Sequence, residues 1–361
     1  MKIKQLKLKN YRNYNLLELE FDSSTNIFYG DNAQGKTNIL ESIYLCGTTK
    51  SHRGTKDKDL INFGEEESHI EAIIEKRNMD YKIDIHLKKN SPKGIAINKI
   101  PIKKATELFG IVNIVFFSPE DLNIIKNGPA ERRKFIDLEL AQLDKVYLSD
   151  LSNYNRIINQ RNKLLKDVYD RKELNEMLDV WDMQLVQYGN KIIKRRKEFI
   201  NQLNEIVKKV HTHLSGGKEN LFIYYEPSNG NEDLEKSVFY NRERDIRMKS
   251  TSVGPHRDDI CFMIEKMDIR KFGSQGQQRT AALSLKLAEI ELVKNITNDT
   301  PILLLDDVLS ELDKNRQNYL LDSIKDIQTL ITCTGVDDFV NNRFNVNKIF
   351  KVYNGCVTKE N

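Results

Sequence analysis

The feature that most constrains the fold of this 361-residue chain is a short loop bracketed by glycines, with apolar segments on both sides. The segment NIFYGDNAQGKTNILESIYL, residues 26–45, starts as an apolar run and then forms this loop from Gly30 to Gly35. Lys36 and Thr37 follow directly, and apolar residues then recur at the spacing of a helix. A strand, a tight loop and a helix in this order predict an α/β fold with a parallel sheet.

The loop has the composition of a phosphate-binding loop (P-loop). Its glycines let backbone N–H groups face the phosphates, Lys36 reaches the β- and γ-phosphates, and the Thr37 hydroxyl can ligate Mg²⁺. We therefore predict ATP and Mg²⁺ as cofactors. The predicted nucleotide contacts of this segment are Gly30, Asp31, Asn32, Ala33, Gln34, Gly35, Lys36, Thr37 and Asn38.

A second apolar strand is predicted near the C-terminus, in TPILLLDDVLSELD at 300–313. It ends in Asp306 and Asp307, and ligands of a parallel sheet gather at the carboxyl ends of its strands. An aspartate at that edge can hold Mg²⁺ through water, so Asp306 is the predicted metal partner of Thr37. Lys36, Asp306 and Asp307 are the predicted catalytic residues.

A second cluster of glycine and glutamine lies at KFGSQGQQRTAALSLKLAE, residues 271–289, and runs directly into an amphipathic pattern. The start of a helix carries free backbone N–H groups and a positive dipole end, so it favours anions. Ser274, Gly276 and Gln277 are therefore candidate phosphate contacts. The alternative is a glycine linker that only caps the following helix.

Composition excludes several classes of protein. The 57 basic residues nearly balance the 53 acidic ones, so any surface for nucleic acid must be local. The four cysteines form no C-x-x-C pair, which favours a reduced, cytoplasmic setting over a disulfide or metal framework. No apolar run approaches the roughly 20 residues that a membrane helix needs, so we expect no membrane association.

Between the two halves of the α/β pattern lies a region with helical periodicity. One apolar stripe runs from Tyr147 to Val168 with Arg161 on a missing rung, and another runs from Leu174 to Leu214 with a gap at 195–196. Two such stripes predict an antiparallel coiled-coil hairpin. The predicted domains are a head formed by 1–117 and 221–361, and an inserted helical arm at 118–220.

Seven segments together resemble one family. They are LKNYRNY at 8–14, GDNAQGKTNILESIYL at 30–45, SHRG at 51–54, SPEDL at 118–122 with GPAERRKFID at 128–137, SVGPHRDD at 252–259, FGSQGQQRT at 272–280 and LLLDDVLSELD at 303–313. The P-loop and the two motifs near the C-terminus resemble the ATPase heads of the ABC superfamily, in its SMC-like chromosome-maintenance branch. The order and spacing of all seven are similar to the bacterial RecF family over essentially the whole chain.

The resemblance implies an ABC-type P-loop ATPase head, with a mixed sheet, an antiparallel β subdomain and an inserted helical arm. It also implies a recombinational-repair ATPase that binds duplex and gapped DNA, forms an ATP-dependent homodimer, and works with RecO and RecR to help load RecA at gaps. In such heads the signature segment of one subunit caps the nucleotide on the other subunit. Ser274, Gly276 and Gln277 would then contact the partner's γ-phosphate.

Two departures from the ABC pattern point to slow ATP hydrolysis, which the resemblance to the family implies is stimulated by DNA. Asp307 stands where these ATPases usually have a glutamate, and its shorter carboxylate holds a water less well for in-line attack. The usual histidine after the next strand is missing, and Thr332 or Thr334 is available in its place. Both losses suggest a timed clamp rather than a motor.

Several residues remain open between two interpretations. Arg53 either links DNA to the nucleotide or is a solvated loop residue, and His256 with Arg257 either contacts nucleotide or DNA or braces the sheet. The basic segments 190–199 and 131–134 either hold DNA phosphates or are solvated helix faces. His211 and His213 lie two residues apart, on different sides of a predicted helix, and we do not expect them to be ligands.

Two other classes of protein share parts of the pattern. A nucleotide-binding subunit of a membrane transporter would need only a short helical insertion and would be expected to keep the glutamate and the histidine that are missing here. A chromosome-tethering protein with a long coiled coil would need much longer arms. A DNA-binding ATPase used as a switch fits the chain better than either.

Overall fold

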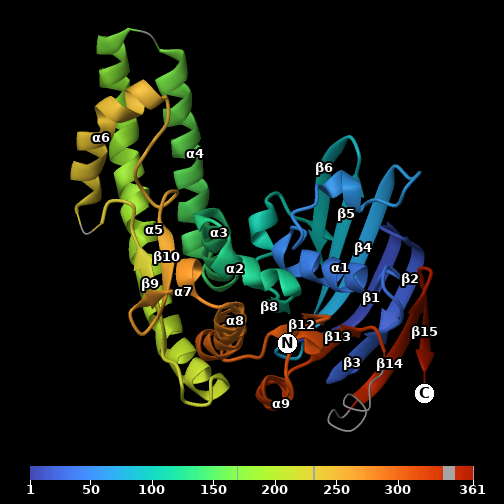
Figure 1. Cartoon of the computed structure of the whole chain (residues 1–361). Coiled ribbons are helices and arrows are strands. Elements are labelled where there is room, and N and C mark those ends of the chain that lie inside the picture. Colours follow the sequence, from blue (N-terminus) through green and yellow to red (C-terminus); the bar gives the residue numbers. More distant parts are fainter. Residues whose placement is uncertain (169, 231, 336–345, 361) are drawn as a thin grey trace. The chain divides into compact units, whose positions relative to one another are not determined.

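The computed structural model describes residues 1–168, 170–230, 232–335 and 346–360. The chain forms two compact units, Met1–Asp121 with Lys286–Asn361 (unit 1) and Leu122–Leu285 (unit 2), which are coloured by sequence in Figure 1. Unit 2 extends beyond the predicted arm of 118–220 because it also contains the strands and helices up to residue 285. The functional boundaries of the head and the arm stay a prediction.

Unit 1 contains a mixed six-stranded sheet in the order β15-β14-β3-β13-β12-β8. Its five parallel strands are β8 (Ile114–Phe117), β12 (Ile302–Asp306), β13 (Thr329–Cys333), β3 (Thr25–Tyr29) and β14 (Val346–Tyr353), and β15 (Cys356–Glu360) pairs antiparallel at the edge. Strands β8 and β12 are buried throughout, as the apolar runs in the sequence predict for a parallel sheet. The predicted strands before the P-loop and before Asp307 are therefore confirmed.

A second six-stranded sheet of unit 1 is antiparallel, in the order β2-β1-β4-β5-β6-β7. It consists of β1 (Lys2–Tyr11), β2 (Tyr14–Glu20), β4 (Glu67–Lys76), β5 (Met79–Lys88), β6 (Ser91–Ile97) and β7 (Ile100–Pro101). Buried and exposed residues alternate along β4 and β5, so one face is packed and the other meets solvent. This is the predicted antiparallel subdomain.

Helix α1 (Lys36–Thr48) follows the P-loop and contacts both sheets, through β4 of one and through β8, β12 and β13 of the other. Its residues from Ile39 to Thr48 are almost all buried, so the helix is held rigidly. The described residues of the unit also form helix α9 (Lys314–Ser323) and short 3₁₀ turns at Asp57–Leu60, Ala105–Glu107, Pro119–Asp121 and Leu309–Glu311. Helix α8 (Gln275–Thr297) begins in unit 2 and ends in unit 1.

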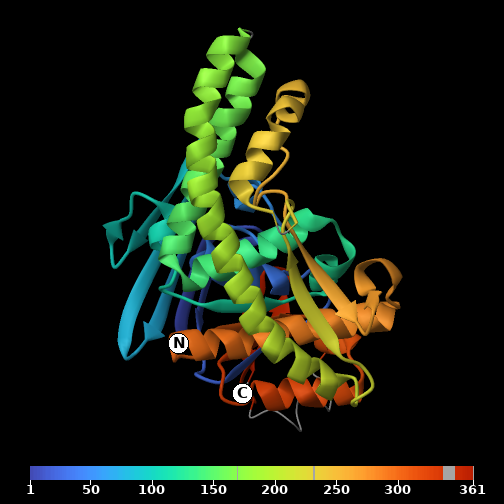
Figure 2. The same cartoon turned by 90° about the vertical axis from the view of Figure 1, so that its left-hand side faces the viewer.

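Unit 2 is dominated by two long helices, α4 (Lys145–Asp167) and α5 (Arg171–Leu214), which lie side by side in Figures 1 and 2. At a rise of 1.5 Å per residue, the 44 residues of α5 span about 66 Å. Leucines 164, 165, 174 and 178 form a buried cluster near the turn between the helices. The predicted helical hairpin is confirmed, and its apolar stripes face each other.

Buried arginines fill the gaps in these apolar stripes. The Arg161 side chain is fully buried, and its guanidinium binds the carboxylates of Asp182 at 2.6 Å and Asp245 at 2.8 Å. The Arg196 side chain is also buried and binds Asp137 at 2.7 Å. A buried charge is tolerated only when it is paired with an opposite charge. Arg161 and Arg196 are therefore polar links between elements and not breaks in the packing.

Unit 2 also contains shorter helices and a small antiparallel sheet. They are the helices α2 (Leu122–Lys126), α3 (Pro129–Leu143), α6 (Leu234–Met248) and α7 (Ile269–Phe272), with the antiparallel strands β9 (Leu221–Glu226), β10 (Asp259–Ile264) and β11 (Met267–Asp268). α5 packs against both β9 and α6. Among the described helices of the whole chain, none is long and apolar enough to cross a membrane.

Candidate nucleotide site

The P-loop takes a backbone conformation that requires glycine at its two ends. Gly30 has a φ of +149°, and a Cβ built there would come within 2.2 Å of the carbonyl oxygen of Val352. Gly35 has a φ of +111°, and its Cβ would come within 2.4 Å of the Asn13 side chain. Both glycines are therefore needed for the curl of the loop, as the motif predicts.

The P-loop ends at the start of α1, where Lys36 lies across the loop. Its ammonium group donates to the carbonyl oxygens of Gly30 at 2.6 Å and Asp31 at 2.8 Å. Among the described residues, no side chain caps α1, and its first turn contains no acidic residue. A cation and an uncapped helix start therefore lie together, which is the arrangement that favours a phosphate.

Thr37 and Asp306 meet across 269 residues of sequence. The Thr37 hydroxyl donates to Asp306 Oδ1 at 2.7 Å, because strand β12 ends beside the start of α1. The Thr332 hydroxyl also donates to this oxygen at 2.7 Å, from the end of the neighbouring strand β13. Hydroxyl and carboxylate oxygens are the ligands that Mg²⁺ prefers. The residues predicted to hold the ion are thus brought together.

Asp307 lies just beyond β12, and its left-handed backbone, with a φ of +56°, ends the strand. Its N–H donates to the Thr332 hydroxyl at 3.1 Å, so Thr332 connects both aspartates. Burial raises the pKa of the Asp307 carboxyl, and the neighbouring Asp306 and Glu311 carboxylates raise it further, whereas Lys36 opposes them. Thr334, the other predicted candidate for the missing histidine, is exposed.

Two residues that support the P-loop were not predicted. The Asn13 amide donates to the carbonyl of Gln34 at 3.0 Å and accepts from Asn38 at 2.8 Å, and the Tyr14 hydroxyl donates to the carbonyl of Gly35 at 3.1 Å. Both belong to the segment LKNYRNY, which spans the turn from β1 to β2, with Asn13 in the turn and Tyr14 at the start of β2. The sequence marks this segment as a family motif, but nothing local indicates its contact with the loop.

A buried carboxylate, Glu41 on α1, connects the P-loop helix with two loops. It accepts hydrogen bonds from Arg12 at 2.9 Å and from Ser51 at 2.5 Å. Burial would raise the pKa of Glu41, but these hydrogen bonds hold it below its usual value. Next to Ser51, burial lowers the pKa of His52 to about 4, and its ring packs on Phe116. Arg53 is exposed, so both interpretations of it stay open.

The signature cluster lies in unit 2 at the start of α8. Ser274 and Gln277 form a reciprocal cap, because each side chain accepts a hydrogen bond from the other's backbone N–H, at 3.2 and 3.0 Å. Ser274 and Gly276 are exposed, and a Cβ at Gly276 would meet only the Ser274 hydroxyl oxygen within 4 Å. This cap corresponds to the alternative in which the cluster only caps the following helix. With the cap formed, the Ser274 hydroxyl and Gly276 still lie at the surface.

The segment SVGPHRDD lies in unit 2, where it connects several elements. The His256 ring contacts the Tyr154 hydroxyl at 2.8 Å and the Thr251 carbonyl at 3.1 Å, and Arg257 donates to the same carbonyl at 3.1 Å. Asp259 binds Arg132 at 2.5 Å. These contacts support the bracing interpretation of His256 and Arg257.

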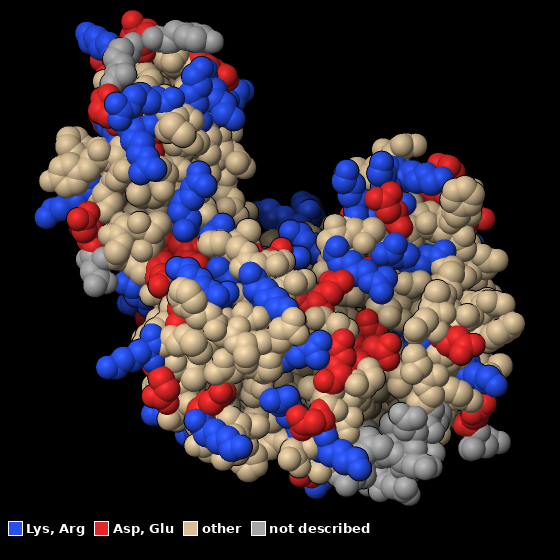
Figure 3. Space-filling view, viewed as in Figure 1, with Lys and Arg blue, Asp and Glu red and all other residues tan. Residues whose placement is uncertain are grey.

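Neither interpretation of the two basic segments, DNA contact or a solvated helix face, fits all of their arginines. Arg132 and Arg196 are buried and paired with carboxylates, and Arg195 binds Asp144 at 2.7 Å, so these arginines hold unit 2 together. Among the basic residues of the segment 190–199, only the lysines are exposed: Lys191, Lys194 and Lys197. On the face seen in Figure 3, Lys and Arg are interspersed with Asp and Glu, as the nearly balanced charge predicts.

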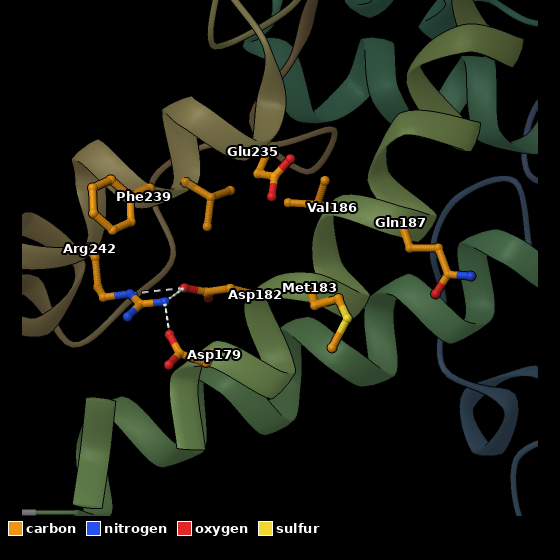
Figure 4. Close-up of a pocket in the computed structure, with 9 residues that line it drawn as sticks. Asp179, Asp182, Met183, Val186, Gln187, Glu235, Phe239 and Arg242 are labelled. Atoms are coloured by element: carbon orange, nitrogen blue, oxygen red, sulfur yellow. Dashed lines mark hydrogen bonds and ion pairs between the residues drawn. The ribbon is translucent and has the colours of Figure 1, made fainter. Parts of the chain in front are cut away.

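A separate pocket of about 400 Å³ lies between α5 and α6 (Figure 4). Arg242 on α6 binds Asp179 and Asp182 on α5, both at 2.7 Å, and Met183 and Phe239 supply apolar walls. No predicted nucleotide contact lines it. The pocket is therefore not part of the site described above.

Comparisons with known proteins agree with the geometry. The family model "RecF/RecN/SMC N terminal domain" matches residues 2–358. The chain is similar to "DNA replication and repair protein RecF" of Agathobacter rectalis, with 63% identity over 357 residues and 99% of each chain covered. The protein of the same name from Lachnospira eligens is 61% identical over 363 residues, with both chains fully covered.

Solved structures give the same result. The structure described as "recombination mediator protein RecF-ATP in RecFOR pathway" matches with a TM-score of 0.93 and 37% identity, covering 99% of this chain and 97% of that one. An Smc head domain from Pyrococcus furiosus matches with a TM-score of 0.58 and 18% identity, over 99% of this chain and 95% of that one. The second match concerns the fold alone.

Proposed function

Because the chain belongs to the RecF family, within the RecF/RecN/SMC N-terminal domain class, we propose that it is an ATP-dependent DNA-binding protein of recombinational repair and replication restart. In this proposal it binds duplex and gapped DNA, forms a homodimer with ATP, hydrolyses ATP slowly, and helps to load RecA at single-strand gaps together with RecO and RecR. The names of its relatives support a role in DNA replication and repair. The similar structure of RecF with ATP supports ATP binding and a place in the RecFOR pathway.

The observation that carries the proposal is the meeting of Thr37 with Asp306 beside Lys36. Thr37 and Asp306 would hold Mg²⁺, which supplies charge neutralisation at the β- and γ-phosphates when bound. Lys36 would exchange its two carbonyl contacts for the phosphates, since an ammonium binds a charged oxygen more strongly than a neutral one. Asp307 would orient the attacking water.

The signature supports a site shared between two chains. The start of α8, with Ser274, Gly276 and Gln277, lies at the surface of unit 2 and carries the Ser274 hydroxyl. The side chains of Ser274 and Gln277 each accept a hydrogen bond from the backbone N–H of the other residue. In the proposal this surface covers the γ-phosphate held by the P-loop of a second copy. The dimer would then form only with ATP and would open after hydrolysis.

Mixing two inactive variants tests the shared site. Lys36→Ala spoils the P-loop and keeps the signature, whereas Ser274→Arg spoils the signature and keeps the P-loop. A heterodimer collects both defects in one site and leaves the other site intact. We therefore expect ATPase activity to reappear on mixing, together with ATP-dependent dimers by size-exclusion chromatography with light scattering.

The controls are each variant alone, which should stay inactive, and Lys50→Ala, which changes an exposed lysine after α1 and should bind ATP normally. ATP affinity of the Lys36→Ala chain should fall by roughly 10- to 100-fold, because a charge-assisted hydrogen bond is lost. Heterodimers that form but stay inactive and nucleotide-free would show that the signature serves its own chain. Normal ATP affinity of the Lys36→Ala chain would contradict the whole proposal.

A further inference from the structure

The solvent-facing side of strands β4 and β5 carries three metal-ligand side chains together. His69 on β4 lies directly opposite His86 on β5, and their rings stack with centroids 3.9 Å apart and 20° between the planes. Glu67 precedes His69 by two residues and therefore shares its face of the strand. Its Oε2 lies 3.0 Å from His86 Nε2.

We propose that Glu67, His69 and His86 bind a divalent transition-metal ion such as Zn²⁺. One ligand atom from each residue lies within 4.8 Å of the other two, and rotation of these solvent-facing side chains can bring all three to one ion. Two imidazole nitrogens and one carboxylate oxygen form a ligand set suited to zinc, and they leave a fourth position open. Mg²⁺, which prefers oxygen ligands, is not expected to bind.

The surrounding sheet leaves this trio accessible. In the register of the strands, Lys9 of β1 and Gly94 of β6 flank the histidine pair. Because Gly94 has no side chain, nothing on β6 covers His86 from that position. Lys88 lies 3.7 Å from Glu67 with both side chains half exposed, and surface ion pairs of this kind contribute only about 0–1 kcal/mol. A metal ion can therefore displace the lysine.

The protonation state favours coordination. Partial burial lowers the pKa of His69, and the neighbouring His86 lowers it further. Lys9 and Lys88 also lower this pKa, whereas Glu67 raises it. Neutral imidazole is the form that ligates a metal. Hydrogen bonding to His86 lowers the pKa of Glu67, which keeps this ligand ionised at neutral pH.

The test is calorimetric titration of the full chain with Zn²⁺ in the absence of nucleotide. The background carries Cys356→Ser, because Cys356 is an exposed thiol that can bind zinc on its own. We expect one zinc per chain at this trio. His69→Ala, His86→Ala and Glu67→Gln should each weaken binding by at least about tenfold, since even outer partners of metal ligands contribute 10- to 100-fold.

The matched control is His213→Ala, which removes an exposed histidine of α5 and should leave zinc affinity unchanged. Circular dichroism checks the fold of each variant. We expect the fold to be kept, because the substituted residues face solvent, whereas Ser68, Ile70 and Leu87 of the same strands face the core. Cobalt provides a second readout. Visible bands of bound Co²⁺ should disappear in His86→Ala. Absence of zinc binding, or zinc affinity in both histidine variants equal to that of the background chain, would overturn the site.

Discussion

At the scale of single residues, Thr332 connects the two aspartates of the nucleotide site. It donates to Asp306 and accepts from the N–H of Asp307, and its side chain is buried at the end of β13. Thr332 is therefore the candidate for the position where ABC heads usually carry a histidine. Its hydroxyl group holds the Asp306 carboxylate and the backbone N–H of Asp307 in place.

Thr332→Val should lower Mg²⁺-dependent ATP hydrolysis by roughly 10- to 100-fold, because an outer partner of a metal ligand is lost. ATP binding without Mg²⁺ should persist, since the P-loop is untouched. Thr332→Ser should restore most of the activity. Thr329→Val is the matched control, because Thr329 is a buried threonine of the same strand whose hydroxyl donates to the Ile327 carbonyl. Equal loss in both valine variants would contradict a specific role for Thr332.

His256 makes the stability of the chain depend on pH. Burial lowers its pKa to about 4, whereas the unfolded value is 6.5. The folded state thus binds fewer protons between these values, so the stabilisation is complete above pH 6.5 and is lost as the pH falls toward 4. By linkage the loss amounts to at most about 3 kcal/mol.

His256→Asn should remove this part of the pH dependence, as measured by urea denaturation from pH 7.5 to 4.5. The variant should be less stable than the wild type at pH 7.5, and the difference should shrink at acid pH. His213→Asn, at an exposed position, should keep the wild-type slope. A constant difference across the range would mean that His256 is not buried as a neutral ring.

At the scale of elements, buried arginines fix how the helices of unit 2 pack. Arg161 of α4 binds Asp182 of α5, and it also binds Asp245 of α6, so one side chain joins three helices. Asp182 is shared with Arg242, which lines the pocket of Figure 4. The network links the three helices by ion pairs at a position where a leucine would only add apolar contact.

Arg161→Met should destabilise the chain by roughly 3–5 kcal/mol, because the fully buried Asp245 carboxylate loses its cation. Chemical denaturation followed by circular dichroism measures the change. Lys163→Met alters an exposed residue of the same helix and should change stability by less than about 0.5 kcal/mol. Similar values for the two variants would mean that the buried network contributes little.

At the scale of the whole molecule, the nearly balanced charge limits where DNA can bind. Among the described basic residues of 190–199, the exposed lysines 191, 194 and 197 lie three residues apart on α5, so they project from one side of the helix. Lys191 also lies 3.8 Å from Asp150. These lysines replace Arg195 and Arg196 as the residues of the arm to be tested against DNA.

Changing the three lysines to glutamine should weaken DNA binding about equally for all sequences and lower the salt slope of log Kd by up to about 3, about one per phosphate contact. Binding measured by fluorescence anisotropy from low to moderate salt gives this slope. The matching arginine triple variant keeps the charge and should keep the slope. An unchanged slope in the glutamine variant would exclude this face of the arm.

The sequence alone was enough to predict features that depend on short spacings. The P-loop, the strand ending at Asp306, the antiparallel sheet and the helical hairpin all follow from periodicity or from residues a few positions apart. Their physical basis is local, because side-chain direction repeats every 2 residues in strands and every 3.6 in helices. The same spacings led to the ATP and Mg²⁺ prediction, and the roles of the individual site residues stay predictions.

Only the tertiary structure decided which charges are available and which residues support the site. Arg132 and Arg196 look like surface cations in the sequence, but their carboxylate partners lie 127 and 59 residues away. Asn13 reaches the P-loop, and Thr332 reaches Asp306 because β13 lies between β3 and β12 in the sheet. Such contacts depend on strand order and on packing between distant segments, and residue spacing carries no information about either.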